Sequence, residues 1–242
     1  MSDTAPVTFT LAGILRGLKR TAGLSVGVFV YGAGFGLMAV QAKLSAWQAV
    51  AMSIAVFSGS AQLAAIGVLN AGASSLAAMA WALVATILVI NARYTLFSAT
   101  MRPWLGALPP AKSYGTLFIL GDGSWMVSMD AYERGERDAG FVFGSSASGC
   151  FVWFLGTWIG AVAGNIVPDP QRLGLDFFFA AFAAAMATGL TRKRADIPVI
   201  VLAAAIGILG AGMGAYGSAI VVAGLAGGAV AWLRTPADGA TR

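Results

Sequence analysis

The first polar cluster in an otherwise apolar stretch is the run Phe-Ser-Gly-Ser-Ala-Gln, which holds Ser58, Gly59, Ser60 and Gln62. Three hydrogen-bonding side chains and a glycine inside a hydrophobic segment indicate a helix that is unwound or kinked against a cavity. Backbone groups freed there would be available to a polar ligand. The alternative is helix packing, because small residues let helices approach and Ser and Gln bond to neighbouring helices. For this run alone, packing is the simpler interpretation.

Asn91 and Arg93 form a second polar group, at the end of the third apolar stretch. An arginine guanidinium can hold a carboxylate through two hydrogen bonds, and the asparagine amide offers both a donor and an acceptor. Arg93 could therefore bind the carboxylate of a substrate. Arginines near the ends of membrane spans usually extend to the lipid headgroups instead, and position alone favours that alternative.

Two carboxylates fall within apolar stretches. Asp122 lies between Gly121 and Gly123, and Asp176 begins the run Asp-Phe-Phe-Phe. A carboxylate inside lipid is unfavourable unless it faces a partner or water, so it is a candidate for coupling to a proton or cation. Asp176 also suits a helix N-terminus, where the helix dipole favours negative charge. Asp122 is the stronger coupling candidate, although a pair with Arg93 would make both residues structural.

The residue inventory narrows the chemistry. The chain has no histidine and one cysteine, Cys150, which excludes a histidine general base, a histidine metal site and an intrachain disulfide. The glycine-rich stretch 32–36 lacks the strand and helix context of a nucleotide fingerprint, and no phosphate-binding loop ending in Gly-Lys-Ser or Gly-Lys-Thr occurs. We therefore expect no enzyme activity, no cofactor and no metal site.

The composition is that of an integral membrane protein. Of 242 residues 58% are apolar and only 10% are charged, and the mean hydropathy is +0.80. Soluble domains carry about 25% charged residues, so this chain cannot cover a globule with water-compatible surface and lipid must cover it instead. The net charge of +5 reflects basic residues between apolar stretches, which set orientation in a membrane. We expect no nucleic-acid partner.

The apolar stretches predict an all-α, polytopic transmembrane helix bundle. A span needs about 20 predominantly apolar residues. The candidate stretches are 24–40, 47–69, 76–90, 116–129, 141–167, 173–190 and 197–233. The last is too long for one crossing, and Gly210, Gly212 and Gly214 mark a turn that divides it. These stretches predict eight spans, with seven as the alternative because 116–129 is short and interrupted.

The distribution of positive charge predicts the orientation. With eight spans and a cytoplasmic N-terminus, Lys and Arg inside outnumber those outside by ten to five, which favours both ends in the cytoplasm. We expect one transporter domain over 1–242, with a cytoplasmic or interfacial segment at 1–22, including a short interfacial helix at 9–18, and a polar tail at 234–242.

Two short runs resemble each other within the chain. Gly-Leu-Met-Ala at 36–39 is similar to Gly-Ala-Val-Ala at 160–163. These runs suggest an inverted repeat in which spans one to three recur as spans five to seven, an arrangement found in many carriers. Glycine and alanine are abundant here, so a chance match is the competing interpretation.

The motifs, taken in order, resemble those of the AzlC family. They are Gly-x-x-Phe-Gly-Leu at 32–37, Phe-Ser-Gly-Ser-Ala-Gln at 57–62, Asn-Ala-Arg-Tyr at 91–94 and Leu-Asp-Phe-Phe-Phe-Ala-Ala-Phe at 175–182. The resemblance implies the large subunit of a bacterial branched-chain amino acid exporter, driven by an ion gradient and paired with a small AzlD-type membrane subunit. Two departures are Tyr94, where the family often has histidine, and Gly123, where the second acid of a Thr-Asp-Glu-like segment is missing.

The residues and the resemblance together predict a proton-coupled exporter of branched-chain amino acids in the bacterial inner membrane. In this hypothesis Arg93 and Asn91 hold the substrate carboxylate, Asp122 receives the ammonium or a proton, and the Ser58–Gln62 cluster lines the site. Phe57, Phe177 and Phe178 are the expected apolar walls. The alternatives are a carrier or channel for another small solute, and a membrane assembly subunit that transports nothing.

Overall fold

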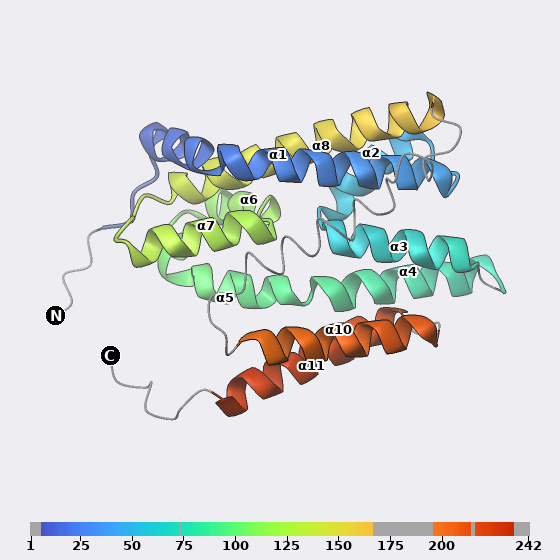
Figure 1. The fold of residues 1–242 in the computed structure, drawn as a ribbon. Coiled ribbons are helices and arrows are strands. Elements are labelled where there is room, and N and C mark those ends of the chain that lie inside the picture. The colour runs from blue at the N-terminus through green and yellow to red at the C-terminus, as the bar shows by residue number, and fades with distance from the viewer. Residues whose placement is uncertain (1–5, 73, 167–195, 214–215, 235–242) are drawn as a thin grey trace.

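The chain is helical over nearly all of the residues that the computed structural model describes, which are 6–72, 74–166, 196–213 and 216–234. The all-α class is therefore confirmed for this part of the chain. Figure 1 shows the helices: α1 (Leu11–Gln41), α2 (Ala46–Val56), α3 (Gly59–Ala71), α4 (Leu76–Asn91), α5 (Arg93–Leu105), α6 (Pro110–Phe118), α7 (Asp122–Glu133), α8 (Gly140–Ile166), α10 (Ile197–Gly212) and α11 (Tyr216–Arg234).

Three helical stretches of the described chain are long and apolar enough to cross a membrane: Leu11–Gln41, Leu76–Leu105 and Gly140–Ile166. Their outward faces carry large apolar side chains, such as Leu76 and Trp81, which are 86% and 74% exposed. Such surfaces suit lipid rather than water. The protein is therefore a multi-pass membrane protein, whereas its orientation and a total of about eight spans stay predictions.

The first helix is longer than the sequence predicts. The expected interfacial helix at 9–18 and the first span at 24–40 form one continuous helix, α1. Thr10 caps its N-terminus by accepting a hydrogen bond from the Gly13 N–H, as N-cap residues do. The predicted span 141–167 corresponds to α8.

The third predicted span, 76–90, ends too early. Ala92, between α4 and α5, keeps helical angles of φ −53° and ψ −27°, and the helical stretch continues to Leu105. Arg93 therefore lies within a continuous helical stretch of 30 residues, and its guanidinium donates hydrogen bonds to Ser58, Ser60 and Asp122. The Arg93 side chain therefore turns into the bundle, which contradicts the interpretation that it extends to the headgroups.

Helices α1 and α8 run parallel along their length and pack through glycines (Figure 1). A Cβ added to Gly32 would lie 2.8 Å from the Trp153 carbonyl oxygen, and one added to Gly36 would lie 2.7 Å from the Ala161 nitrogen. Conversely, a Cβ on Gly160 would lie 2.6 Å from Ala33 Cα. Real Cβ atoms essentially never come this close, so only glycine permits this approach, as in Gly-x-x-x-Gly helix pairs.

The runs 36–39 and 160–163, on which the repeat hypothesis rests, lie on these two parallel helices. An inverted repeat would relate helices that run in opposite directions. The likeness between these runs therefore does not support inversion. The next segment of the supposed second copy, 173–190, lies outside the described residues.

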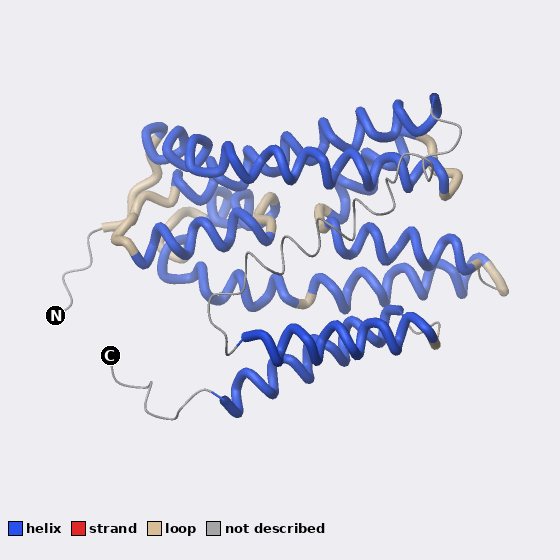
Figure 2. The backbone as a smooth tube through the Cα atoms, viewed as in Figure 1, coloured by secondary structure: helices blue, strands red, loops and turns tan. Residues whose placement is uncertain are grey.

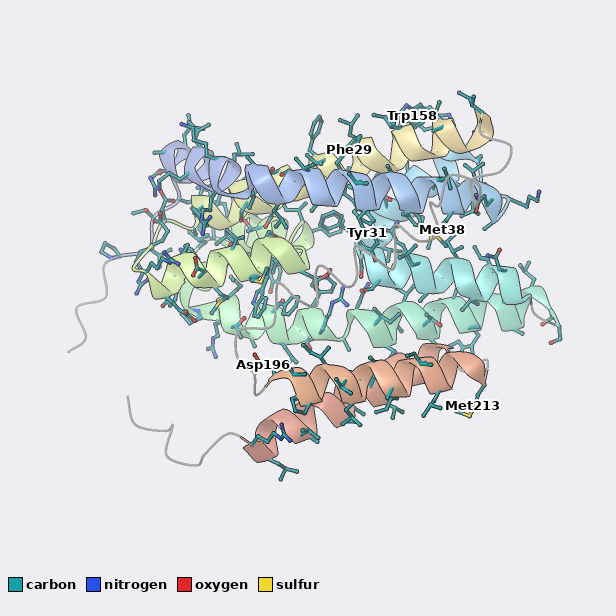
Figure 3. All side chains as sticks on the ribbon, viewed as in Figure 1. Phe29, Tyr31, Met38, Trp158, Asp196 and Met213 are labelled. Atoms are coloured by element: carbon teal, nitrogen blue, oxygen red, sulfur yellow. The ribbon has the colours of Figure 1, made fainter. Side chains whose placement is uncertain are left out.

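The apolar run at the end of the chain divides as the sequence predicts. α10 ends at Gly212 and α11 begins at Tyr216, so the run is divided directly after two of the three predicted turn glycines, Gly210 and Gly212. The two helices pack against each other as a hairpin, and α11 contacts α3 and α4. Met213, at the end of α10, points away from the bundle (Figure 3).

Asp138 joins the start of α1 to the start of α8. Its carboxylate accepts hydrogen bonds from the Thr10 N–H at 3.0 Å, the Thr10 hydroxyl and the Gly140 N–H at 2.9 Å, and Arg16 lies 3.5 Å away. Asp138 is 6% exposed. Burial alone would raise the pKa of Asp138, but the hydrogen bonds and the Arg16 charge outweigh burial and lower the pKa below its usual value.

Replacing Asp138 with asparagine is expected to destabilise the protein by about 1–3 kcal/mol, because an amide cannot accept all of these donors. Since the folded-state pKa of Asp138 is lowered, its contribution is complete above the unfolded-state pKa of about 4. It is lost as the pH falls through the folded-state pKa. Melting temperatures in detergent between neutral and acid pH test this, with exposed Glu133→Gln as the control. A difference in melting temperature between wild type and Asp138→Asn that stays constant down to acid pH contradicts this prediction.

Candidate functional site

Interrupted helices meet in the middle of the structure. Between α2 and α3, Phe57 adopts the left-handed conformation at φ 36° and Ser58 is extended at φ −151°. Between α6 and α7 the chain leaves the helix until Gly121, which is extended at φ −111°. Figure 2 shows these interruptions as loop segments between helices. The unwound helix that the sequence predicts at Ser58–Gln62 is therefore present, at Phe57 and Ser58.

The first turns of α3 and α7 both begin at these breaks. The start of α3 has no side-chain cap, so its N–H groups are not bonded by the N-cap side chain. At α7, the Ser124 hydroxyl accepts from the Gly121 N–H at 3.0 Å. Helix N-termini carry partial positive charge and uncompensated donors, which suits anionic groups such as a carboxylate.

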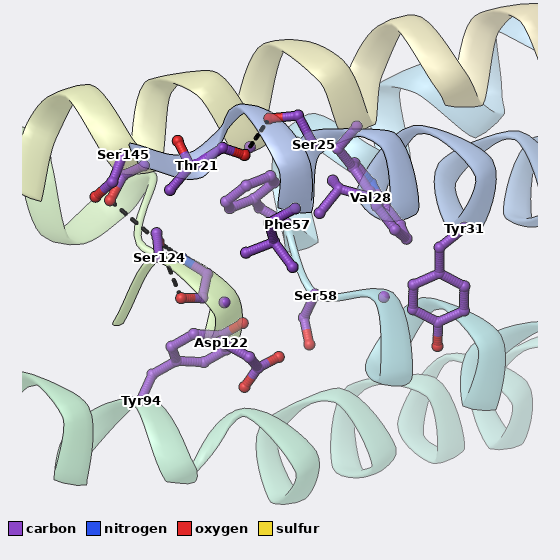
Figure 4. A pocket seen from close by; sticks show the side chains of 17 residues that line it. Thr21, Ser25, Val28, Tyr31, Phe57, Ser58, Tyr94, Asp122, Ser124 and Ser145 are labelled. Atoms are coloured by element: carbon purple, nitrogen blue, oxygen red, sulfur yellow. Dashed lines mark hydrogen bonds between the residues drawn. The ribbon is translucent and has the colours of Figure 1, made fainter. Parts of the chain in front are cut away.

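A cavity of about 120 Å³ lies at these breaks (Figure 4). The walls come from α1 and α8 on one side and from the α2–α3 break, α5 and α7 on the other. The lining residues are Thr21, Leu24, Ser25, Val28, Tyr31, Phe57, Ser58, Gly59, Tyr94, Gly121, Asp122, Gly123, Ser124, Ser145, Ser146, Gly149 and Trp153. Among these described residues, Asp122 is the one that carries a charge.

An ion pair lies at the edge of this cavity. The Arg93 Nη2 donates to Asp122 Oδ2 at 2.9 Å. Arg93 also donates to the hydroxyl oxygens of Ser60 at 2.9 Å and Ser58 at 3.3 Å, and its guanidinium lies 5.2 Å from the centre of the Tyr94 ring. Arg93 does not line the cavity itself, but Asp122, Ser58 and Tyr94 do. The guanidinium therefore stands directly behind the cavity wall and neutralises the carboxylate that faces it.

Besides the contacts of Arg93, a second network of hydrogen bonds lies beside the cavity and supports one of its walls. Gln62 is fully buried and does not line the cavity. Its Nε2 donates to Ser53 Oγ at 2.9 Å, and Trp153 Nε1 donates to the same oxygen at 3.2 Å. Thr157 completes the network, with its hydroxyl 3.1 Å from that of Ser53. This network fixes the orientation of the Trp153 ring, which lines the cavity.

The predicted site residues are thus brought together in part. Ser58 and Gly59 line the cavity, and Ser60 and Arg93 lie behind it, whereas Gln62 points to Ser53. Asn91 carries a buried Oδ1 that has no hydrogen-bond partner among the described residues. Asp176, Phe177 and Phe178 lie outside the described residues.

Several lining side chains were not predicted. α1 contributes Thr21, Ser25 and Tyr31, and Tyr31 lies on the side of α1 that faces α3, opposite to Phe29 and Trp158 (Figure 3). α8 contributes Ser145 and Ser146. The sequence does contain a pattern that could have indicated them, because Ser and Thr recur on α1 and α8 at helical spacing. Single hydroxyls are common in membrane helices, however, and rarely identify a binding site.

The fold and the site together define a class: a multi-pass helical membrane protein whose interrupted helices line a cavity with an ion pair at its edge, as in membrane transport proteins. A family model described as AzlC protein matches residues 23–167. The chain therefore belongs to the AzlC family. This is a family of branched-chain amino acid transport, not of enzymes, and its members typically pair with AzlD. No curated protein and no solved structure matches the chain significantly.

The family match extends from α1 to the end of α8. All residues that line the cavity, except Thr21, lie within it. The cavity is therefore built by the part of the chain that defines the family.

Proposed function

We propose that this chain is a secondary transporter that exports branched-chain amino acids across the bacterial inner membrane. The observation that carries the proposal is the Arg93–Asp122 ion pair at the edge of a largely apolar cavity. An amino acid with an aliphatic side chain needs a positive group for its carboxylate, a negative group for its ammonium and an apolar wall. The cavity and the pair supply all three.

In the proposed complex the substrate inserts between the two charged groups. Asp122 faces the cavity and receives the ammonium. Arg93, released from Asp122, binds the carboxylate, together with Asn91 and the N–H groups at the start of α3 near Gly59. Phe57 and Trp153 are the apolar walls. In the protein without substrate, Arg93 and Asp122 thus pair with each other in place of the substrate's carboxylate and ammonium, so neither charge is left unpaired.

The proposed energy source is the proton gradient, with Asp122 as the coupling residue. Asp122 pairs with Arg93 in the resting state and would exchange that partner for the substrate or a proton during transport. We further propose a small AzlD-like membrane subunit as the partner and a cytoplasmic N-terminus. The family's usual pairing supports the partner, and the distribution of positive charge supports the orientation.

The test is export of labelled valine, leucine, isoleucine and methionine from cells that express this chain with and without an AzlD-type subunit. We expect export that needs both proteins and stops when the proton gradient is collapsed. Export of none of the four, with both proteins verified in the membrane, contradicts the proposed substrate. Export that persists without the gradient contradicts the proposed coupling alone.

Asp122→Asn is expected to lower net export about tenfold or more, because a charge-assisted hydrogen bond to the ammonium is lost. The remaining transport should no longer respond to the proton gradient. Initial export rates at imposed pH gradients measure this. Asp122→Glu, which keeps the carboxylate, is the matched control and should keep the response. An Asn variant that still follows the gradient rules out Asp122 as the coupling residue.

A further inference from the structure

The glycines that line the cavity differ in what surrounds them. A Cβ on Gly59 would lie 2.8 Å from the Trp153 ring, and a Cβ on Gly123 would lie 2.6 Å from a methyl group of Leu24. At both positions a side chain would have to move to make room for a Cβ. A Cβ on Gly149, in contrast, would meet no heavy atom of the described residues within 4 Å, although Gly149 lines the cavity.

Gly149 also differs from the other glycines of α8. Gly144, Gly156 and Gly160 lie against the backbone of α1, where an added Cβ would clash. Gly149 has no such packing reason, and it lies inside a helix, where glycine is among the least favourable residues. Gly149 lies on the same face of α8 as Ser145 and Trp153, four residues to either side, and these line the cavity with it.

Gly149 lies on the wall of the cavity opposite to Asp122, so the space beside it could hold the side chain of a bound amino acid. Asp122 and Tyr94 lie on the α5 and α7 side of the cavity, whereas α8 forms the opposite wall together with α1 (Figure 4). A hydrogen-bonding contact of 2.9 Å between the hydroxyls of Ser25 and Ser148 connects these two helices at this level. A zwitterion held at Asp122 and Arg93 therefore directs its side chain towards α8.

We propose that Gly149 determines the length of side chain that the site accepts, by leaving space for the terminal methyl groups of leucine, isoleucine or methionine. This inference rests on the proposed function, since it takes the charged end of an amino acid to lie at Asp122. A methyl group at position 149 would fill the space that the longer side chains need. Valine and alanine, which are shorter, would still fit.

The test compares Gly149→Ala with wild type in competition between valine, leucine and alanine for transport. We expect the leucine-to-valine ratio to fall about tenfold in the variant, the size of effect that one methylene has in an apolar pocket. Gly149→Val should shift the preference further, towards alanine. Gly67→Ala is the matched control, because a Cβ there also meets nothing within 4 Å but Gly67 lies outside the cavity lining.

The outcomes separate this inference from the function on which it rests. If wild type transports the amino acids and Gly149→Ala leaves the ratio unchanged, the inference is overturned and the proposed function stands. If wild type transports none of them, both are overturned. Loss of all transport in Gly149→Ala, with an unchanged melting temperature, also overturns the inference, because a size filter must still admit alanine.

Discussion

Arg93→Gln is expected to abolish transport while the protein still folds and reaches the membrane. The guanidinium donates to Asp122, Ser58 and Ser60, and in the proposed mechanism it is the group that receives the substrate carboxylate. Glutamine keeps a donor but removes the charge. Charge-assisted hydrogen bonds contribute about 1.5–3 kcal/mol each, so the loss of two corresponds to a reduction of transport by a hundredfold or more.

The folding of this variant can be judged from the exposure of the pair. The Arg93 and Asp122 side chains are 30% and 42% exposed, so the pair is only partly buried, and a carboxylate left without its partner costs less than in a fully buried pair. Membrane abundance and melting temperature are the controls. Arg93→Lys keeps the charge but not the planar fork of donors, and it should retain only a small part of the activity.

A double variant separates the two roles that Arg93 could have. If Arg93 only neutralises Asp122, then Arg93→Gln combined with Asp122→Asn removes both charges and should recover transport from the level of Arg93→Gln to that of Asp122→Asn alone. If Arg93 binds the substrate carboxylate, the double variant stays inactive. Normal transport in Arg93→Gln itself would end the assignment of any role in binding.

The break at Phe57 and Ser58 could be predicted because its cause is local. A polar run with a glycine interrupts an apolar segment, and such interruptions in membranes occur where the backbone lines a cavity. The position of Arg93 could not be predicted in the same way. A charge at the edge of an apolar run resembles the end of a span. Only the contacts with Ser60 and Asp122, 33 and 29 residues away in the chain, show that this charge is paired within the bundle.

The packing of α1 against α8 could also be predicted only in part from the sequence. Its glycines are visible in the sequence, and their spacing is typical of close helix packing. The partner of each helix and the parallel direction are tertiary properties, which depend on contacts between residues more than a hundred positions apart. For this reason the hydroxyls of Thr21, Ser25, Ser145 and Ser146 were not recognised as neighbours, although all four contribute to the α1–α8 wall of the cavity.

Gly160→Leu is expected to prevent the protein from reaching its folded state. A Cβ at this position would lie 2.6 Å from Ala33 Cα and still closer to the Ala33 carbonyl. These are backbone atoms of a continuous helix and cannot rotate away. Overpacking in a well-packed core costs about 1–3 kcal/mol when side chains can adjust. Leucine against a rigid backbone should cost more, because α1 and α8 must separate along their length.

The loss of stability should depend on how close the two helices are at the substituted position, and not on the loss of glycine itself. Gly164 lies one turn further along α8, and its added Cβ would have 3.3 Å to Leu37 Cα, which a small shift can accommodate. Gly164→Ala should therefore lower the melting temperature little, Gly160→Ala clearly, and Gly160→Leu should leave almost no folded protein in the membrane. Equal stability of the two alanine variants would contradict the close α1–α8 contact. Because the walls of the cavity on this side are α1 and α8 themselves, a separation that the fold survived would still displace Ser25 and Trp153 from the site.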